Sequence, residues 1–146
     1  MTLWLDTSVL VALYVPEARS ERVVRLVRRS GESIPFSQLH ELELANALHL
    51  RVFRREAKAR AVEATLARVW EDLEAGILHR VAIEWPAALA RAIELADRHT
   101  SRVGCRSLDL VHVAGAIMSG SRRFVTADRR QSTVARRAGL ATTRIG

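Results

Sequence analysis

A chain of 146 residues is long enough for one domain with its own hydrophobic core, and we expect a single domain over residues 1–146. Its composition, 49% hydrophobic and 27% charged, excludes long disordered segments. The only cysteine, Cys105, excludes an intramolecular disulfide and a cysteine-based zinc site. No apolar stretch approaches the roughly 20 residues that span a bilayer, and the first residues do not form a secretion signal. We therefore expect a cytoplasmic protein with no membrane partner.

The net charge of the chain is +7, from 23 Lys and Arg residues against 16 Asp and Glu residues, and Lys58 is the only lysine. Arginine presents a planar fork of N–H donors that matches phosphate oxygens. A small, basic, arginine-rich domain therefore predicts a polyanionic partner, either RNA or an acidic protein segment. A genome rich in G and C would also explain the scarcity of lysine, but not the excess of positive over negative charge.

Short apolar runs alternate along the chain with segments whose apolar residues recur every three or four positions. Glycine or proline ends most of the helical segments, and Ser37 and Ser107 precede two of them as N-caps. The polar segment 100–106 is predicted to be a loop. The expected elements, in chain order, are a strand at 2–5, helices at 7–14 and 17–30, a strand at 34–36, helices at 37–53 and 55–76, a strand at 77–83, helices at 86–99 and 107–118, a strand at 124–126, a helix at 129–138 and a strand at 140–145. This alternation predicts an α/β three-layer sandwich, with a central, mainly parallel sheet flanked by helices.

Two acidic residues directly follow expected strands. Asp6 comes after the strand at 2–5, and Asp128 comes two residues after the strand at 124–126. In open α/β sheets, ligands bind beyond the carboxyl ends of the strands, so both acids are candidates for a site. Each of them can instead serve as the N-cap of the following helix, which is the more ordinary role of an acid in this position.

Two further candidate acids lie within apolar helices. Asp109 is surrounded by apolar residues on nearly every face of its helix, where an ionised carboxylate needs a partner or a metal. In the first helical turn it could also simply complement the helix dipole. Glu41 and Glu43 are about 200° apart around the helix at 37–53, so they point to opposite sides. Glu43 shares its face with Asn46, and the sequence leaves open which of the two acids faces a site.

Four carboxylates without a cluster of Cys or His side chains favour a hard divalent ion, Mg²⁺ or Mn²⁺, over zinc. Such an ion polarises a phosphate and activates a water molecule, and the basic surface would attract a nucleic acid. The sequence therefore favours metal-assisted hydrolysis of phosphodiester bonds.

At four places the sequence resembles the PIN-domain family, and within it the VapC-type toxins of type II, VapBC toxin–antitoxin systems. Each motif is short, but all four occur in the family's order and spacing. The matching segments are Leu5-Asp6-Thr7-Ser8-Val9-Leu10, Glu43-Leu44-Ala45-Asn46-Ala47-Leu48, Leu108-Asp109-Leu110-Val111-His112-Val113-Ala114 and Phe124-Val125-Thr126-Ala127-Asp128. Ala127 departs slightly from the pattern, because an aromatic residue is common there.

The resemblance implies a PIN-like fold in which Asp6, Glu43 and Asp109 are the three core acids and Asp128 is the more variable fourth. It also implies that these acids are catalytic and hold Mg²⁺ or Mn²⁺. Thr7, Asn46 and Thr126 would be supporting residues. The activity implied is endonucleolytic cleavage of RNA, by a homodimer that a VapB-type antitoxin silences. The glutamate assignment depends on the register of the motif, which fits Glu43 better than Glu41.

Other residues receive more ordinary interpretations. His112 is expected to be a hydrogen-bonded histidine in the core or near the site rather than a ligand or base. Four arginines flank the fourth acid and are candidates for RNA contacts, although a solvated surface would explain them as well: Arg122, Arg123, Arg129 and Arg130.

Two alternative functions remain compatible with the sequence. One is a housekeeping PIN-domain nuclease in RNA processing, without an antitoxin, and the other is a non-catalytic PIN-like scaffold that binds RNA or protein. A phosphoacceptor receiver domain is excluded because no lysine follows a late strand. A dehalogenase-type phosphatase is excluded because Asp6-Thr7-Ser8 has no second acid.

Overall fold

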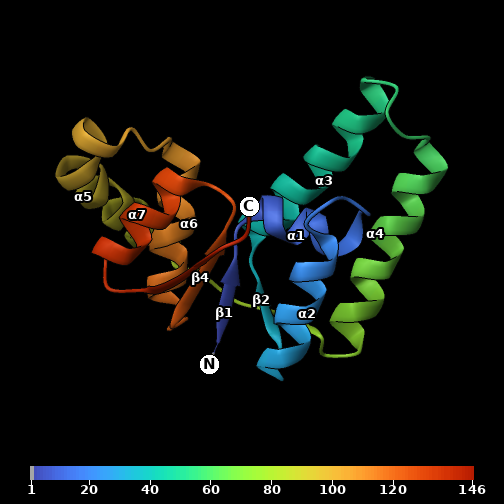
Figure 1. Cartoon of the computed structure of the whole chain (residues 1–146), viewed down its shortest axis with the longest axis horizontal. Helices are drawn as coiled ribbons and strands as arrows, with labels where there is room; N and C mark the ends of the chain where they lie inside the picture. The colour runs from blue at the N-terminus through green and yellow to red at the C-terminus, as the bar shows by residue number, and fades with distance from the viewer. Residues whose placement is uncertain (1) are drawn as a thin grey trace.

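The structure, a computed structural model, describes residues 2–146. Helices and strands alternate along the chain (Figure 1). The strands are β1 (Leu3–Leu5), β2 (Ile34–Phe36), β3 (Leu78–Arg80), β4 (Arg123–Thr126) and β5 (Ala141–Arg144). The helices are α1 (Thr7–Tyr14), α2 (Ser20–Ser30), α3 (Gln38–Phe53), α4 (Ala59–Glu74), α5 (Trp85–Val103), α6 (Ser107–Met118) and α7 (Arg129–Arg137).

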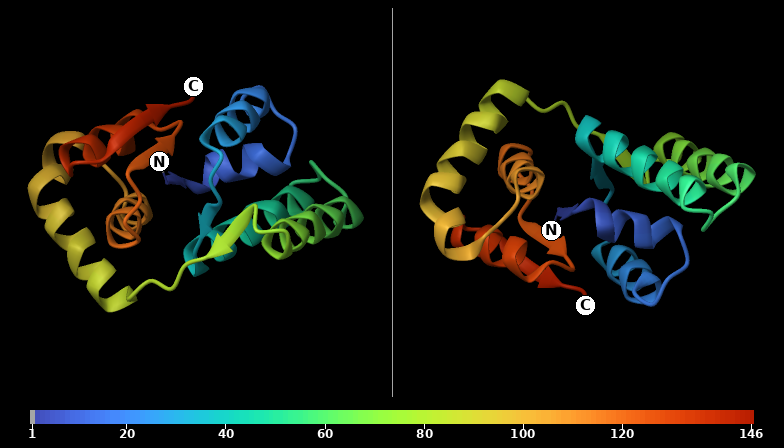
Figure 2. Two further views of the ribbon diagram at one scale, coloured as in Figure 1. Left: turned by 90° about the horizontal axis from the view of Figure 1, so that it is seen from below. Right: turned by 90° about the horizontal axis from the view of Figure 1, so that it is seen from above.

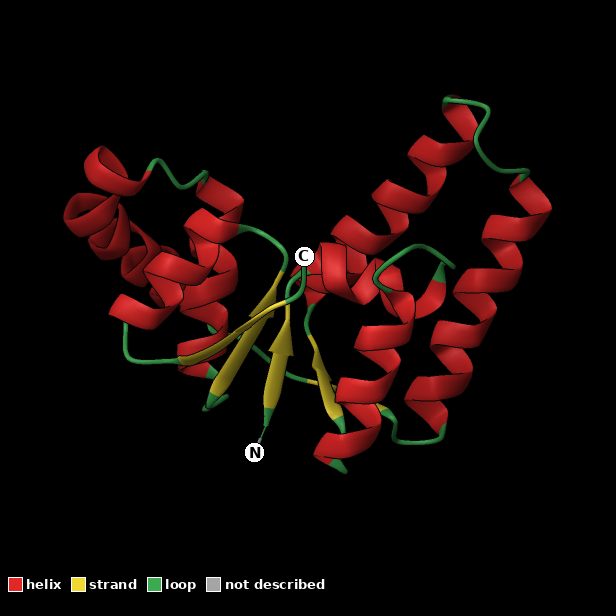
Figure 3. Ribbon diagram, in the orientation of Figure 1, coloured by secondary structure: helices red, strands yellow, loops and turns green. Residues whose placement is uncertain are grey.

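The strands pair in parallel, in the orders β1-β4-β5 and β2-β3. In the first sheet, Trp4 lies opposite Phe124 and Leu5 lies opposite Val125. β2 runs beside β1, so that the strands form one layer in the middle of the molecule (Figure 3). The carboxyl ends of β1 and β4 therefore meet at the same edge, which is where the sequence predicts a site.

Helices cover both faces of this layer, with α1–α4 on one side and α5–α7 on the other (Figures 1 and 2). Successive side chains of a strand point to opposite faces, and the two hydrophobic cores follow this alternation. Leu3 and Leu5 belong to the core beneath α1–α4, whereas Trp4 and Phe124 belong to the core beneath α5–α7. The predicted three-layer arrangement with a parallel sheet is confirmed.

The segment 100–106 differs from its prediction as a loop. The polar residues at its start remain helical, and α5 ends only at Gly104, which has a left-handed φ of 72° and donates its N–H to the Thr100 carbonyl at 2.7 Å. Glycine adopts this conformation without steric cost, so it, and not the polar composition, ends the helix. Ser107 is the first residue of α6 and not its cap; the N-cap position is Arg106, which makes no side-chain capping bond.

The helix predicted at 55–76 begins later, at Ala59. Arg55 has a positive φ of 61°, and the next two N–H groups donate to the Arg51 carbonyl, which closes the end of α3. The other predicted cap is confirmed, because the Ser37 hydroxyl accepts the N–H of His40 at the start of α3. Within residues 2–146, none of the helices combines the length and apolar character needed to cross a bilayer.

Candidate active site

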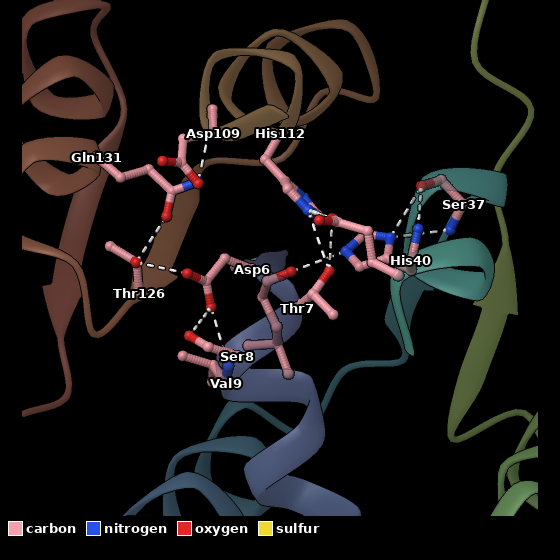
Figure 4. Close-up of polar contacts among 12 residues, drawn as sticks. Asp6, Thr7, Ser8, Val9, Ser37, His40, Asp109, His112, Thr126 and Gln131 are labelled. Carbon is pink, nitrogen blue, oxygen red and sulfur yellow. Dashed lines mark hydrogen bonds and ion pairs between the residues drawn. The ribbon is translucent and has the colours of Figure 1, made fainter. Parts of the chain in front are cut away.

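A cavity of about 410 Å³ opens at the edge where β1 and β4 end, and four acidic side chains line it. Asp6 follows β1 and Asp128 follows β4, whereas Glu43 comes from α3 and Asp109 from α6. These residues lie in four separate segments of the chain, and the parallel sheet brings them together. Figure 4 shows the polar contacts around this cavity.

Asp6 is buried, with 6% of its surface exposed, and both of its carboxylate oxygens accept hydrogen bonds. Oδ1 accepts from the Ser8 hydroxyl and from the Val9 N–H, each at 2.9 Å, and the second of these bonds caps α1. Oδ2 lies 2.7 Å from the Thr126 hydroxyl at the end of β4 (Figure 4). Asp6 is therefore both the helix cap considered from the sequence and a fixed member of the acid cluster.

Gln131 links the acids of α6 and α7, and the sequence did not single it out. Its side-chain amide oxygen lies 2.7 Å from the Thr126 hydroxyl, and its amide nitrogen donates to the Asp109 carbonyl at 3.2 Å. Its backbone N–H donates to Oδ1 of Asp128 at 2.8 Å, which caps α7. The signal in the sequence was its place three residues after an expected N-cap, where the backbone N–H bonds to the cap. Nothing in the pattern indicated the side chain's contacts.

Glu43 is held by Thr7 and His112. Oε1 accepts from the Thr7 hydroxyl at 2.9 Å and from Nε2 of His112. Trp4 donates its indole N–H to Nδ1 of His112 at 3.1 Å, so the ring proton is on Nε2 and points at Glu43. The pKa of Glu43 is lowered overall: burial raises it, but the hydrogen bonds from His112 and then from Thr7 outweigh that effect. His112 is thus the near-site, hydrogen-bonded histidine that the sequence suggested.

Asp109 is partly buried and lies near a second acid of the cluster, Asp128. Its pKa is raised, first by burial and also by the nearby carboxylate of Asp128, although Arg106 acts in the opposite direction. Nε of Arg106 lies 3.4 Å from Oδ2 of Asp109, and the arginine side chain is 84% exposed. A cation that entered the cavity would relieve this repulsion.

The donors in the cavity fit a hard divalent cation, because they are carboxylate oxygens with no thiolate among them. Within residues 2–146, no three carboxylate, imidazole or thiol side chains are already grouped closely enough to hold one ion. The hydrogen bonds above explain the spacing, since Glu43 is turned toward His112 and Asp128 caps α7.

The predicted residues of α3 do not all face the cavity. Glu43 lines the cavity, whereas Glu41 points away and pairs with Arg80 at 2.8 Å, and Asn46 is exposed and does not line the cavity.

Among the four arginines, Arg122 and Arg123 lie at the start of β4, at the opposite end of the strand from the acids. The other two, Arg129 and Arg130, follow Asp128 in the first turn of α7.

The chain belongs to the PIN-domain family, whose pattern matches residues 3–137. Members of this family are generally nucleases, and they generally use divalent metals. The family and the fold predicted from the four motifs are therefore confirmed.

Among the solved structures that share this fold, two cover nearly the whole chain. One is the crystal structure of VapBC2 from Rickettsia felis bound to a DNA fragment from their promoter. A chain of that structure is 15% identical in sequence to this chain, the TM-score is 0.65, and the match covers 100% of each chain. The other is the crystal structure of FitAcB from Neisseria gonorrhoeae, which is 20% identical with a TM-score of 0.60 and covers 97% of this chain and 96% of that one. No curated protein shows significant similarity to the chain.

Proposed function

We propose that the chain is a metal-dependent endoribonuclease that acts in the cytoplasm as the toxin of a type II, VapBC-type toxin–antitoxin pair. One observation carries the proposal: acids from four separate segments, Asp6, Glu43, Asp109 and Asp128, line a single cavity of a PIN domain. The fold that the chain shares with VapBC2 and FitAcB supports the toxin role. A VapB-type antitoxin and a second copy of the chain are the protein partners that we propose with it.

Asp6, Asp109 and Asp128, together with Glu43, are the residues that would hold the ion. When bound there, Mg²⁺ or Mn²⁺ supplies Lewis-acid activation of the phosphodiester and of water. The carboxylates alone would repel a phosphate, so the excess of basic residues that gives the whole chain a net charge of +7 is needed to attract RNA.

The protein's own contribution is to fix the acids before the substrate arrives. Thr126 and the start of α1 hold both oxygens of Asp6, which leaves its carboxylate little freedom to turn. Thr7 and His112 hold Oε1 of Glu43 and keep this carboxylate ionised at neutral pH. Oε2 of Glu43 makes no hydrogen bond within residues 2–146, so it is available to accept a proton from a water molecule.

The first test is cleavage of a fluorophore-labelled RNA by the purified protein, with Mn²⁺, with Mg²⁺ or with EDTA. We expect internal cuts with either metal and none with EDTA. Asp6→Ala and Asp109→Asn should each reduce the rate about 100-fold or more, because each removes a carboxylate from the ion. The matched control is Asp97→Asn, which neutralises an exposed acid on α5 and should retain wild-type activity. Full activity in folded Asp6 and Asp109 variants would refute the assignment of the site.

The toxin role is tested separately by inducing the chain in a bacterial host. We expect the wild type, but not Asp6→Ala, to arrest growth and to leave discrete cuts in total RNA. A co-expressed antitoxin should relieve the arrest. Cleavage in vitro without growth arrest would instead indicate the housekeeping nuclease. RNA binding without cleavage would indicate the scaffold.

A further inference from the structure

A second cavity, of about 350 Å³, adjoins the acid cavity and shares Arg106, Asp109 and Asp128 with it. Arg129 and Arg130 line only this second cavity, whereas Asp6 and Glu43 line only the first. We call it the arginine cavity. Carboxylates outnumber arginines by four to two in the acid cavity, whereas three arginines and two carboxylates line the arginine cavity.

The guanidinium groups of the arginine cavity make few contacts within the part of the chain that the structure describes. Within residues 2–146, neither Arg129 nor Arg130 makes an ion pair or a side-chain hydrogen bond. Arg106 has one long contact, 3.4 Å to Asp109, and its side chain is 84% exposed. Three cations therefore border one cavity, and only one of them is engaged by a carboxylate. This arrangement leaves their N–H donors available to an external anion.

The backbone of Gly104 helps to place one of these cations. A Cβ atom at residue 104 would lie 3.7 Å from Nη1 and 3.9 Å from Cζ of Arg130, so the guanidinium lies close beside the glycine. Gly104 also ends α5 with a left-handed φ of 72°. The α5–α6 junction and the first turn of α7 thus meet at the arginine cavity, which explains why the charges gather next to the acids.

We propose that the arginine cavity binds a backbone phosphate of single-stranded RNA, next to the phosphodiester that is cut at the acids. This inference rests on the proposed function and adds the position of a substrate subsite. Guanidinium forks bind phosphate oxygens, whereas the four acids cannot do so without a cation. A phosphate held in this cavity would position the neighbouring linkage over the acids, which is how a basic group beside a metal site contributes to cleavage.

The test is equilibrium binding of a labelled single-stranded RNA in EDTA, measured by fluorescence anisotropy over a range of KCl concentrations. The variant is the double substitution Arg129→Gln/Arg130→Gln. The control is Arg28→Gln/Arg29→Gln, which removes the same charge from α2 on the other face of the sheet (Figure 1). We expect the arginine-cavity variant to bind about tenfold more weakly at 0.1 M salt. Its salt slope should fall by roughly 0.7 for each phosphate that the variant no longer neutralises. The control should stay within about twofold of wild type.

A second measurement locates the phosphate. RNAs with one neutral methylphosphonate linkage on either side of the cut should bind wild type more weakly when the neutral linkage occupies the arginine cavity. The double variant should bind this modified RNA as tightly as it binds the unmodified RNA, because it already lacks the guanidinium groups that contact the phosphate. Equal losses in both proteins at every position would overturn the proposal.

Parallel cleavage assays with Mn²⁺ separate this inference from the function on which it rests. If wild type cleaves RNA but the arginine-cavity variant matches the α2 control in affinity and salt slope, the subsite is refuted and the nuclease stands. If wild type neither binds nor cleaves RNA, the proposed function is refuted and the subsite falls with it. Circular dichroism and urea midpoints equal to wild type show that the variants are folded.

Discussion

His40 makes the stability of this protein depend on pH in a way that the structure specifies. Its ring is fully buried, and both ring nitrogens are engaged (Figure 4). Nε2 lies 2.7 Å from the Leu5 carbonyl, which can only accept, so Nε2 carries the proton. Nδ1 accepts the backbone N–H of Ser37 at 3.0 Å. The neutral imidazole therefore satisfies every partner, whereas a second ring proton would point at the N–H of Ser37.

Burial and, second, the neighbouring His112 lower the pKa of His40 to about 3, against an ordinary value of 6.5. Because the folded-state pKa is depressed, the unfolded chain binds a proton in this interval that the folded chain does not. The stabilisation is then complete above pH 6.5 and is lost as the pH falls from 6.5 toward 3. At about 1.4 kcal/mol per pH unit, the loss from this one group is roughly 2 kcal/mol at pH 5.

Urea denaturation followed by the fluorescence of the three tryptophans measures this loss at pH 7.5, 6.0 and 5.0. The comparison protein is His40→Gln, whose amide does not titrate. The variant is expected to be less stable at pH 7.5, but it should lose about 2 kcal/mol less than wild type between pH 7.5 and 5.0. The difference between the two slopes isolates His40 from all other titrating groups. Parallel pH profiles in the two proteins would refute the argument.

Two further predictions concern packing and a link between helices. Gly115→Ala would place a Cβ 2.9 Å from the buried Trp4 ring, whose indole N–H is already bonded. Overpacking should therefore outweigh the gain in helix propensity. We expect the free energy of unfolding, measured in urea, to fall by about 1–2 kcal/mol. Unchanged or higher stability would show that the ring moves freely. Tyr14→Phe removes a 2.6 Å hydrogen bond to Asp72 that joins α1 to α4, and the phenol stays protonated because burial, followed by the Asp72 hydrogen bond, raises its pKa. A loss of about 1–2 kcal/mol in thermal unfolding is expected, and no loss would mean that solvent replaces this bond fully.

The acids at strand ends were predictable because they depend on local patterns. A short apolar run marks each buried strand, and the parallel arrangement that follows from alternating strands and helices puts their carboxyl ends at one edge. Asp6 and Asp128 therefore could be placed without coordinates, as could the cap at Ser37. The end of α5 was misplaced by a few residues, because polar composition is a weaker stop signal than the positive φ of Gly104.

By itself, then, the sequence determined the order of elements, the parallel sheet and three of the acids that line the cavity, Asp6, Asp109 and Asp128, since these follow from periodicity, turn residues and motif spacing. Only the tertiary structure decided which face of α3 meets the site: Glu43 lines the cavity and Glu41 pairs with Arg80. Only the structure shows that His112 contacts Glu43. It also shows that Arg129 and Arg130 border the acids, whereas Arg122 and Arg123 lie at the far end of β4. These contacts connect residues far apart in the chain, and helical periodicity gives the angle between two side chains but not what each of them faces.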